Sequence, residues 1–302
     1  MVTTMQEPIA LDRGALALIE LALAEDTGSG DITTLATVPA SRRATGRFLV
    51  KQPGVISGLA VVSAVYARVD PRVVVEPLVA DGTAVEPGTI IATVSGPAQA
   101  LLSGERVALN FLQRLSGVAT VTAEYTRCVA GTNARIIDTR KTTPGMRTLQ
   151  KQAIRDGGGH NHRLGLADGI LIKDNHLAAI GTADRIARAV AAARERAPHT
   201  LKIEVEVTSL DELQQAIDAG ADIILLDNMD APTMAEAVRL TAGRALLEAS
   251  GGITLATIRA IAETGVDLIS VGALTHSAPA LDISLDFDVA RDSGTGTRES
   301  GR

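Results

Sequence analysis

The chain has 302 residues, a formal net charge of -6 and 46% hydrophobic residues, with no Trp, two Tyr and three Phe. The acidic balance argues against a surface for double-stranded nucleic acid, and the scarcity of aromatic residues argues against stacking on single strands. The length allows one large domain or two domains of moderate size. We therefore expect no nucleic-acid partner and a core built from Ala, Val, Leu and Ile.

Cys128 is the single cysteine, which excludes an internal disulfide and any metal site made of several cysteines. It lies in a stretch that is predicted to be helical, so a nucleophilic role is not favoured. No apolar run reaches the roughly 18 residues that a membrane-spanning helix needs, and the first residues lack the pattern of a signal peptide. We expect a cytoplasmic protein without a membrane partner.

The first third of the chain predicts a small α+β domain. The expected elements are a helix, a loop, three β-rich segments and a long connecting helix, over 12–23, 25–34, 45–51, 73–77, 89–94 and 101–128. Residues 79–88, V-A-D-G-T-A-V-E-P-G, resemble the hairpin of biotinyl and lipoyl carrier domains. Neither Met-Lys-Met nor Asp-Lys-Ala, the usual settings of the modified lysine, occurs in the sequence. We therefore interpret this part as structural.

From about residue 132 onward, short apolar runs alternate with amphipathic stretches. Strands are predicted over 134–138, 169–173, 203–207, 222–226, 245–248 and 267–271, with helices such as 182–196, 210–219, 231–241 and 255–264 between them. This alternation indicates parallel strands joined by right-handed crossovers. An open doubly wound sheet and a β/α barrel both fit, but no G-x-G-x-x-G opens the first unit, which weakens the nucleotide-binding sheet.

Polar residues gather where these predicted strands end. They are Asp138, Arg140, Lys141, Lys173, Glu206, Asp227, Glu248, Ser250 and Gly272. This regularity favours the barrel, because the catalytic residues of barrels lie at the C-terminal rim of the strands. The glycines after the last two strands, Gly251, Gly252 and Gly272, allow backbone N–H groups and a helix N-terminus to approach a phosphate.

One predicted strand carries a wholly polar face. Lys202, Glu204 and Glu206 alternate with apolar residues, and acids inside a barrel need cations or a metal as partners. Glu206 lies nearest the rim, whereas pairing with Lys202 or another interior cation is the alternative role of Glu204. Glu206 and Asp227 together suit Mg²⁺, a hard cation that is completed by substrate phosphates.

The segment 138–163 concentrates basic residues in an acidic chain. The candidates for binding carboxylates or phosphates are Arg140, Lys141, His162, Arg163 and Lys173. Arg147, Lys151 and Arg155 recur at helical spacing, which fits a solvated helix face as well as a binding role, and both interpretations remain open. These residues together predict a phosphorylated, metal-bound substrate beside a small acid with more than one carboxylate.

Several motifs occur in a fixed order along nearly the whole chain. They are E-D-x-G-x-G-D-I-T-T, D-T-R-K-T-x-P-G-x-R, G-G-G-x-N-H-R-x-G-L, I-K-D-N-H, E-V-E-V, L-L-D-N, E-x-S-G-G and V-G-A-L-T-H-S. With these motifs the chain resembles the quinolinate phosphoribosyltransferases, also called nicotinate-nucleotide pyrophosphorylases (carboxylating), from about residue 19 to residue 287.

The resemblance implies an α/β fold with two domains. An N-terminal α/β sandwich domain over 1–118, to which 282–290 return, is expected to precede an incomplete, seven-stranded β/α barrel over 119–281. The tail, 291–302, is predicted to be disordered because it has too little apolar area to bury. The resemblance also implies a homodimer in which Arg106 is contributed to the active site of the neighbouring subunit.

The resemblance further assigns site residues. Those expected around quinolinate are Arg106 of the neighbouring subunit, Arg140, His162, Arg163 and Lys173, and Thr139 is a further substrate-binding candidate. Lys141 is expected to lie between the two substrates or to reach the pyrophosphate. Glu206 and Asp227 are expected to hold Mg²⁺, directly or through water, and to face the ribose hydroxyls. Those expected to cradle the 5′-phosphate are Ser250, Gly251, Gly252, Gly272 and His276, and Lys141, Glu206 and Asp227 are the catalytic candidates.

The implied reaction transfers phosphoribosyl from phosphoribosyl pyrophosphate (PRPP) to quinolinate with decarboxylation. It gives nicotinate mononucleotide, pyrophosphate and CO2 in de novo NAD biosynthesis, and we expect no covalent enzyme intermediate. One alternative is a related phosphoribosyltransferase acting on nicotinate or another heterocyclic acid. Nicotinate has one carboxylate, which would leave part of the Arg140, Arg163 and Lys173 set unpaired. A barrel that binds a phosphorylated metabolite without catalysis is the other alternative.

Overall fold

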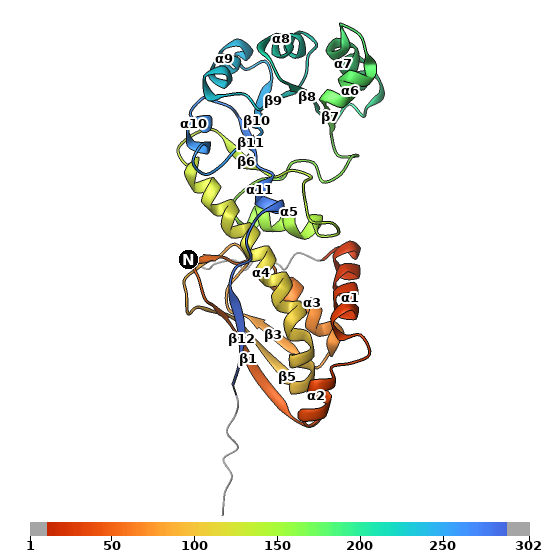
Figure 1. Cartoon of the computed structure of the whole chain (residues 1–302), viewed down its shortest axis with the longest axis vertical. Coiled ribbons are helices and arrows are strands. Elements are labelled where there is room, and N and C mark those ends of the chain that lie inside the picture. The colour runs from red at the N-terminus through yellow and green to blue at the C-terminus, as the bar shows by residue number, and fades with distance from the viewer. Residues whose placement is uncertain (1–10, 289–302) are drawn as a thin grey trace, which may run out of the picture.

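The protein consists of two units joined by a long helix, α4 (Ala98–Cys128), as Figure 1 shows. The computed structural model describes residues 11–288, and the tail that is predicted to be disordered lies outside these residues. Within this part of the chain, none of the helices combines the length and the apolar character that crossing a membrane requires.

The first unit is built on a four-stranded antiparallel sheet in the order β12-β1-β5-β3. Its strands are β1 (Arg43–Val50), β3 (Val74–Pro77), β5 (Ile90–Pro97) and β12 (Ile283–Asp288). The other elements are α1 (Arg13–Thr27), α2 (Ile32–Thr37), α3 (Leu59–Val69) and the short ribbon of β2 (Gly54–Val55) and β4 (Ala84–Val85). Helix α4 packs on the sheet and on α3. The last strand of the chain thus pairs with the first.

The predicted loop over 25–34 is wrong at both ends. Helix α1 continues to Thr27, and α2 begins at Ile32. The side chain of Asp31 accepts a hydrogen bond of 3.0 Å from the Thr34 backbone N–H, which caps α2. The D-I-T-T pattern therefore starts a helix instead of extending a loop.

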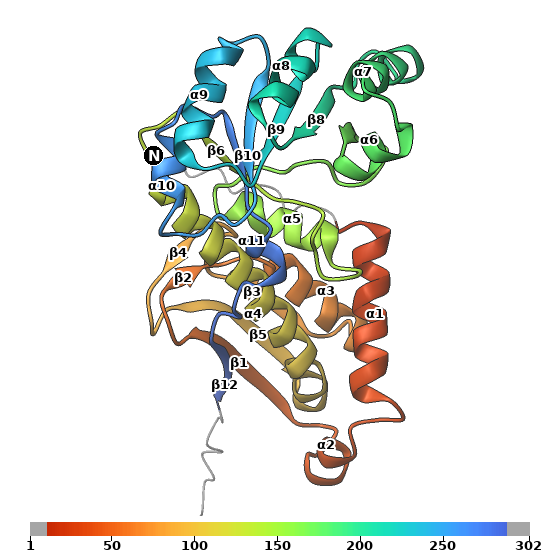
Figure 2. The same cartoon turned by 45° about the horizontal axis from the view of Figure 1, so that its top comes forward.

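The second unit contains six parallel strands in the order β6-β11-β10-β9-β8-β7. They are β6 (Arg135–Ile137), β7 (Ile170–Ile172), β8 (Ile203–Val207), β9 (Ile223–Asp227), β10 (Leu246–Ser250) and β11 (Leu268–Ser270). Its helices are α5 (Arg147–Asp156), α6 (Asp174–Ile180), α7 (Arg185–Arg196), α8 (Leu210–Asp218), α9 (Ala231–Thr241), α10 (Ile258–Ala262) and α11 (Ala273–His276). Figure 2 shows α7, α8 and α9 on the outer side of the sheet. The predicted α/β class is confirmed.

The strand number differs from the seven that the family resemblance implies. The structure describes six parallel strands, and a single parallel bridge between Ile137 and His160 extends the sheet beyond β6. The segment around His160 follows a run of three glycines, which disfavours a regular strand.

Residue alternation in β8 decides what faces the interior. Ile203, Val205 and Val207 are at most 1% exposed and pack toward the helices. Successive side chains of a strand point to opposite faces, so Glu204 and Glu206 point to the face of the sheet away from these helices. Glu204 and Glu206 of the predicted polar face therefore lie on this inner face, whereas Lys202 precedes β8 and is exposed.

Close packing at Gly117 joins the two units. A Cβ atom at this position of α4 would lie 1.9 Å from the carbonyl oxygen of Pro279. The chain segment between α11 and β12 can pass over α4 only because residue 117 has no side chain. This contact sets the position of α11 relative to α4.

A partly buried acid, Asp81, lies where the first unit meets α5. The side chain of Asp81 accepts a hydrogen bond of 3.2 Å from the Leu59 backbone N–H. Burial, more than the nearby charge of Asp156, raises the pKa of Asp81 from 3.8 to about 6. A raised carboxyl pKa contributes stability that is fully present below the unfolded pKa and is lost as the pH rises through about 6.

We therefore expect Asp81→Asn to stabilise the protein at neutral pH. The amide oxygen can still accept from Leu59 and carries no charge, so the free energy of unfolding should rise by on the order of 2 kcal/mol at about pH 8. Near pH 4 the variant and the wild type should be equally stable. Urea unfolding at both pH values measures this, and a difference that does not depend on pH would contradict it.

Candidate active site

Polar side chains from neighbouring strands meet at one end of the parallel sheet. Lys173, Asp227 and Ser250 stand at or directly after the ends of β7, β9 and β10, and Ser250 is in register with Asp227. Glu206 is the next-to-last residue of β8, and Gly272 follows β11 by two residues. The structure thus places the predicted rim residues at the carboxyl ends of the strands, where barrel enzymes have their active sites.

Two arginines lie together in this site. The Nε atom of Arg140 is buried, and no acceptor for it lies among the described residues. Arg163 donates to the Gly169 carbonyl oxygen at 3.1 Å. Burial lowers the pKa of Arg163, and the positive charge of Arg140 lowers it further. Two neighbouring cations, one with an orphaned buried donor, form a site that is suited to a ligand with more than one negative charge.

A buried ion pair holds the segment that carries Arg163. Lys151 of α5 lies 2.5 Å from a carboxylate oxygen of Asp138, and both side chains are at most 3% exposed. Asp138 also accepts from the His162 backbone N–H at 2.8 Å and from the Asn161 amide at 2.8 Å. Lys151 donates to the His162 carbonyl oxygen as well, at 3.1 Å. Lys151 of α5 and Asp138, which follows β6, therefore fix the position of the 161–163 segment.

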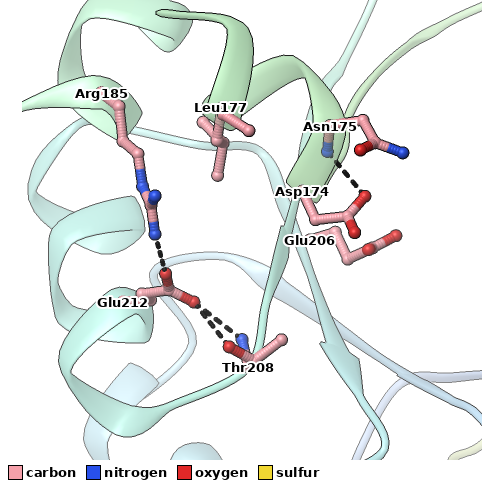
Figure 3. Close-up of a pocket in the computed structure, with 8 residues that line it drawn as sticks. Asp174, Asn175, Leu177, Arg185, Glu206, Thr208 and Glu212 are labelled. Atoms are coloured by element: carbon pink, nitrogen blue, oxygen red, sulfur yellow. Dashed lines mark hydrogen bonds and ion pairs between the residues drawn. The ribbon is translucent and has the colours of Figure 1, made fainter. Parts of the chain in front are cut away.

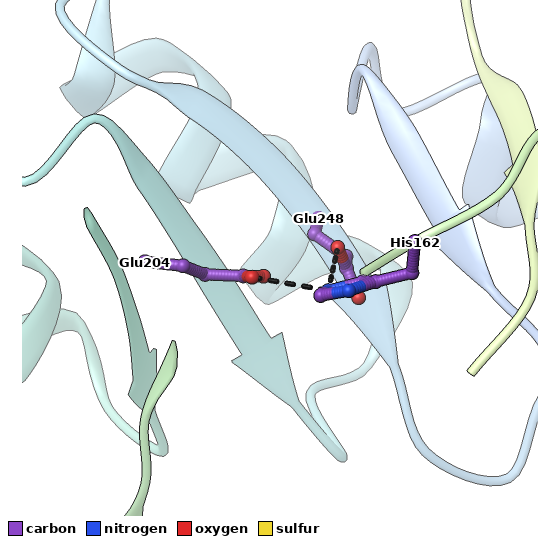
Figure 4. A group of neighbouring side chains, drawn as sticks. All are labelled: His162, Glu204 and Glu248. Carbon is purple, nitrogen blue, oxygen red and sulfur yellow. Dashed lines mark hydrogen bonds and ion pairs between the residues drawn. The ribbon is translucent and has the colours of Figure 1, made fainter. Parts of the chain in front are cut away.

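His162 has both ring nitrogens engaged by the protein. Nδ1 accepts from the Arg163 backbone N–H at 2.7 Å, which assigns the proton of a neutral ring to Nε2. Nε2 lies 3.1 Å from Glu204 Oε2 and 3.7 Å from Glu248 Oε2 (Figure 4). Burial raises the pKa of Glu248 well above its ordinary value, and the charge of Glu204 raises it further.

These three residues are spaced as metal ligands could be, since their ligand atoms lie within 4.8 Å of one another. The hydrogen bonds contradict that use, because an Nε2 that donates to Glu204 has no lone pair for a metal ion. We conclude that Glu204 and Glu248 orient the imidazole of His162. The sequence predicts that Glu204 pairs with Lys202 or another interior cation. In the structure its partner is His162.

Glu206 borders a cavity of about 260 Å³ (Figure 3). Its carboxylate lies 3.3 Å from Lys173 Nζ. The other polar side chains lining the cavity are Asp174, Asn175, Arg185, Thr208 and Glu212. Because Glu212 pairs with Arg185 at 2.8 Å and accepts from Thr208, its charge is already neutralised. Asp227 accepts from the Asn228 amide at 2.7 Å.

The glycine-rich end of the site lies beside Lys141 and His276. A Cβ atom on Gly272 would lie 3.1 Å from Lys141 Cδ and 3.2 Å from His276 Nε2. Gly251 has a φ of +94°, and a Cβ there would lie 2.2 Å from the Asn228 side-chain oxygen, so only glycine fits. Gly252 also has a positive φ, of +60°. Thr139 accepts from the Lys141 backbone N–H at 3.0 Å.

Arg106 stands apart from this group. It is exposed on α4, two residues after Gly104, which packs against Tyr66 of α3 in the first unit. Among the described residues, no hydrogen bond or ion pair involves Arg106.

Comparisons with known proteins identify the family of the chain. Residues 118–286 match the model of the quinolinate phosphoribosyl transferase C-terminal domain, and residues 31–116 match that of the N-terminal domain. The chain belongs to the quinolinate phosphoribosyltransferase family. The matched segments cover more than half of the chain, and both domain models occur in the order that the motifs indicate.

The chain is similar to named proteins of this family from several organisms. The chain is 45% identical over 269 residues to the "probable nicotinate-nucleotide pyrophosphorylase (carboxylating)" of Bacillus subtilis, covering 89% of this chain and 92% of that one. A protein of the same name from Synechocystis is 46% identical over 268 residues, covering 88% and 90%. The structure of the nicotinate-nucleotide pyrophosphorylase from Francisella tularensis superposes with a TM-score of 0.87 at 38% identity, covering 94% of this chain and all of that one.

Sequence patterns missed the residues of this family member that hold its site in place. The helical spacing of Lys151 fits either a solvated helix face or a binding role. The structure shows neither, because Lys151 is buried against Asp138. Arg155 is exposed, as a solvated face requires, while Arg147 donates to the Leu164 carbonyl oxygen. The only available signal for Lys151 was its place in an amphipathic helix, three residues before apolar Ile154.

Proposed function

We propose that the chain transfers phosphoribosyl from PRPP to quinolinate and releases CO2, giving nicotinate mononucleotide and pyrophosphate for NAD biosynthesis. The observation that carries this proposal is the pair of Arg140 and Arg163, of which one has an orphaned buried donor and the other a pKa lowered by burial. Quinolinate has two adjacent carboxylates that can neutralise two adjacent guanidinium groups. The names of the relatives support the same activity.

The reaction follows from where the charges lie. The bond between ribose carbon 1 and pyrophosphate breaks, and Lys141 beside the glycine-rich end neutralises the leaving group. Glu206 and Asp227 stabilise the positive charge that develops on the ribose, and the pyridine nitrogen attacks carbon 1. The ring nitrogen becomes cationic and stabilises the electron pair that the departing CO2 leaves on ring carbon 2. Carbon 2 of the ring then takes up a proton.

His162 has no part in proton abstraction in this proposal. Its Nδ1 accepts from the backbone and its Nε2 donates to Glu204, so neither nitrogen is free to act as a base. The ring fixes the backbone of Arg163 instead. We therefore expect neither a proton-abstracting triad nor a covalent enzyme intermediate.

Mg²⁺ is part of the proposal. Its two proposed ligands, Glu206 and Asp227, offer carboxylate oxygens, and Asp174 lines the cavity beside Glu206. An oxygen-only set with few protein ligands fits a hard cation that shares its coordination with substrate phosphates and water. When bound, the ion would neutralise the pyrophosphate of PRPP.

The remaining fold features that the family resemblance implies belong to the same proposal. The bridge at His160 supplies a seventh strand position for an incomplete barrel. The sheet of the first unit, with α3 and α4 against it, α1 against these two helices and β12 returning to it, supports a sandwich domain over 1–118 and 282–290, followed by a barrel over 119–281. The cytoplasmic location stays a prediction.

The selectivity between acids tests the proposed function. Nicotinate would leave one of the two arginines without a carboxylate, so its kcat/KM should be at least about a hundredfold lower than that of quinolinate. A coupled assay with either acid and PRPP measures this. Equal or faster turnover of nicotinate would favour the paralogue alternative, and no turnover of either acid would favour a binding protein.

We further propose a homodimer in which Arg106 completes the neighbouring site. Exposed Ile32 and Leu35 of α2, 79% and 64% exposed, provide apolar surface near α4 for such an interface. Arg106→Ala should raise the KM for quinolinate by roughly tenfold to a hundredfold, because a charge-assisted hydrogen bond is lost.

Mixed dimers distinguish a shared site from a local one. Arg106→Ala subunits are exchanged with Arg140→Gln subunits, so that each heterodimer contains one intact site and one doubly damaged site. At equal amounts, half of the dimers are heterodimers, and about a quarter of the wild-type activity should return. If exchange is verified and the activity stays at the level of the two parents, the shared site is wrong.

A further inference from the structure

Thr275 is a fully buried threonine in the V-G-A-L-T-H-S segment, between the glycine-rich end of the site and Lys141. It lies on the short helix α11, next to His276, and no part of the proposed reaction uses it. A hydroxyl that is 0% exposed needs hydrogen-bond partners inside the protein.

The carbonyl group of Thr275 accepts from two other helices. Arg114 of α4 donates to it at 2.7 Å and also donates to the Ala278 carbonyl oxygen. Gln150 of α5 donates to it at 3.1 Å. The same Gln150 side chain accepts from the Thr143 backbone N–H at 2.9 Å. The end of α11 is therefore fixed to α4, to α5 and to the loop that follows Lys141.

The hydroxyl group of Thr275 donates to the backbone of Lys141. Its oxygen lies 2.8 Å from the Lys141 carbonyl oxygen and 3.2 Å from that of Gly272. A hydroxyl has one proton, so the shorter contact is the main hydrogen bond. The Lys141 N–H donates to Thr139, so threonine hydroxyls hold this residue on both sides. The Lys141 side chain, which is exposed, then lies against Gly272.

We infer that Thr275 is a positioning residue that holds Lys141 between the acid-binding arginines and the glycine-rich phosphate end. Lys141 follows Arg140 directly, so one hydrogen bond to its carbonyl group ties the acid-binding loop to α11. Thr275 acts through Lys141 and touches no substrate. The inference rests on the proposed function, because it concerns how Lys141 meets the pyrophosphate of PRPP.

A double-mutant cycle on PRPP binding tests this role. Calorimetric titration of the whole protein with PRPP and Mg²⁺ gives a Kd without requiring turnover. Thr275→Val keeps the shape of the side chain and removes the hydroxyl, which should raise the Kd about fivefold. Thr275→Ser keeps the hydroxyl and should stay within about twofold of the wild type. In a Lys141→Ala background, Thr275→Val should change the Kd by less than about twofold.

The Kd values of these variants separate a positioning role of Thr275 from a role in stability alone. Equal weakening by Thr275→Val with and without Lys141, or a Thr275→Ser variant as impaired as Thr275→Val, would mean that Thr275 serves stability alone. Absence of PRPP binding in the wild type would instead overturn the proposed function. If Thr275→Val does not fold, Thr275→Ala removes the same hydroxyl with less bulk and is judged by the same cycle.

Discussion

Replacing Arg140 by glutamine is expected to lower kcat/KM for quinolinate roughly a hundredfold to a thousandfold, the loss typical for one member of a buried charge pair. The unliganded variant should be as stable as the wild type or more stable. Arg140 has a buried donor without an acceptor, and its charge lowers the pKa of Arg163. Removing it relieves a repulsion in the free protein while a carboxylate of the substrate loses its partner.

Steady-state kinetics and thermal unfolding measure the two parts of this prediction. Arg188→Gln is the matched control, because Arg188 is exposed on the outer helix α7 and should affect neither quantity. An Arg140→Gln enzyme with wild-type kcat/KM, or one that loses activity only because it unfolds, would contradict the binding role.

Replacing Lys151 by methionine is expected to destabilise the protein by about 3–5 kcal/mol, because it leaves the Asp138 carboxylate buried without its cation. Asp138 is 0% exposed and still accepts from Asn161 and His162, so it cannot turn toward water. Urea unfolding at neutral pH measures the change. The double variant with Asp138→Asn should recover part of the loss, since the uncompensated charge is gone.

An exposed ion pair provides the control for Lys151. Arg239 and Glu236 pair on the surface of α9 with side chains 68% and 40% exposed, and Arg239→Met should leave stability nearly unchanged. Similar losses from Lys151→Met and Arg239→Met would mean that the Asp138–Lys151 pair is not a buried anchor.

The periodic parts of the fold could be predicted from the sequence. Short Ile- and Val-rich strands alternate with amphipathic helices, and the predicted strand over 203–207 has the bounds of β8. Helix α3, rich in β-branched valines, was not predicted, and neither was α6, which begins directly after Lys173. These helices depend on packing against α4 and α7, and local propensity carries no information on such contacts.

The site could be predicted as a set of residues but not as a network. Strand ends identified Lys173, Glu206 and Asp227, because parallel strands bring their carboxyl ends to one rim. Which side chains pair on the inner face of the parallel sheet depends on distances across non-adjacent segments. The bonds from Thr275 to Lys141 and from His162 to Glu204 span 134 and 42 residues, beyond the reach of any local pattern.

The central claim is that the two arginines hold a dicarboxylate that loses one carboxylate when it is glycosylated. Quinolinate labelled in the carboxylate on carbon 2, incubated with the protein, PRPP and Mg²⁺, tests it most directly. We predict one labelled CO2 for each pyrophosphate released and none when PRPP is omitted. Pyrophosphate release without labelled CO2, or no turnover of quinolinate by the folded protein, would contradict the claim.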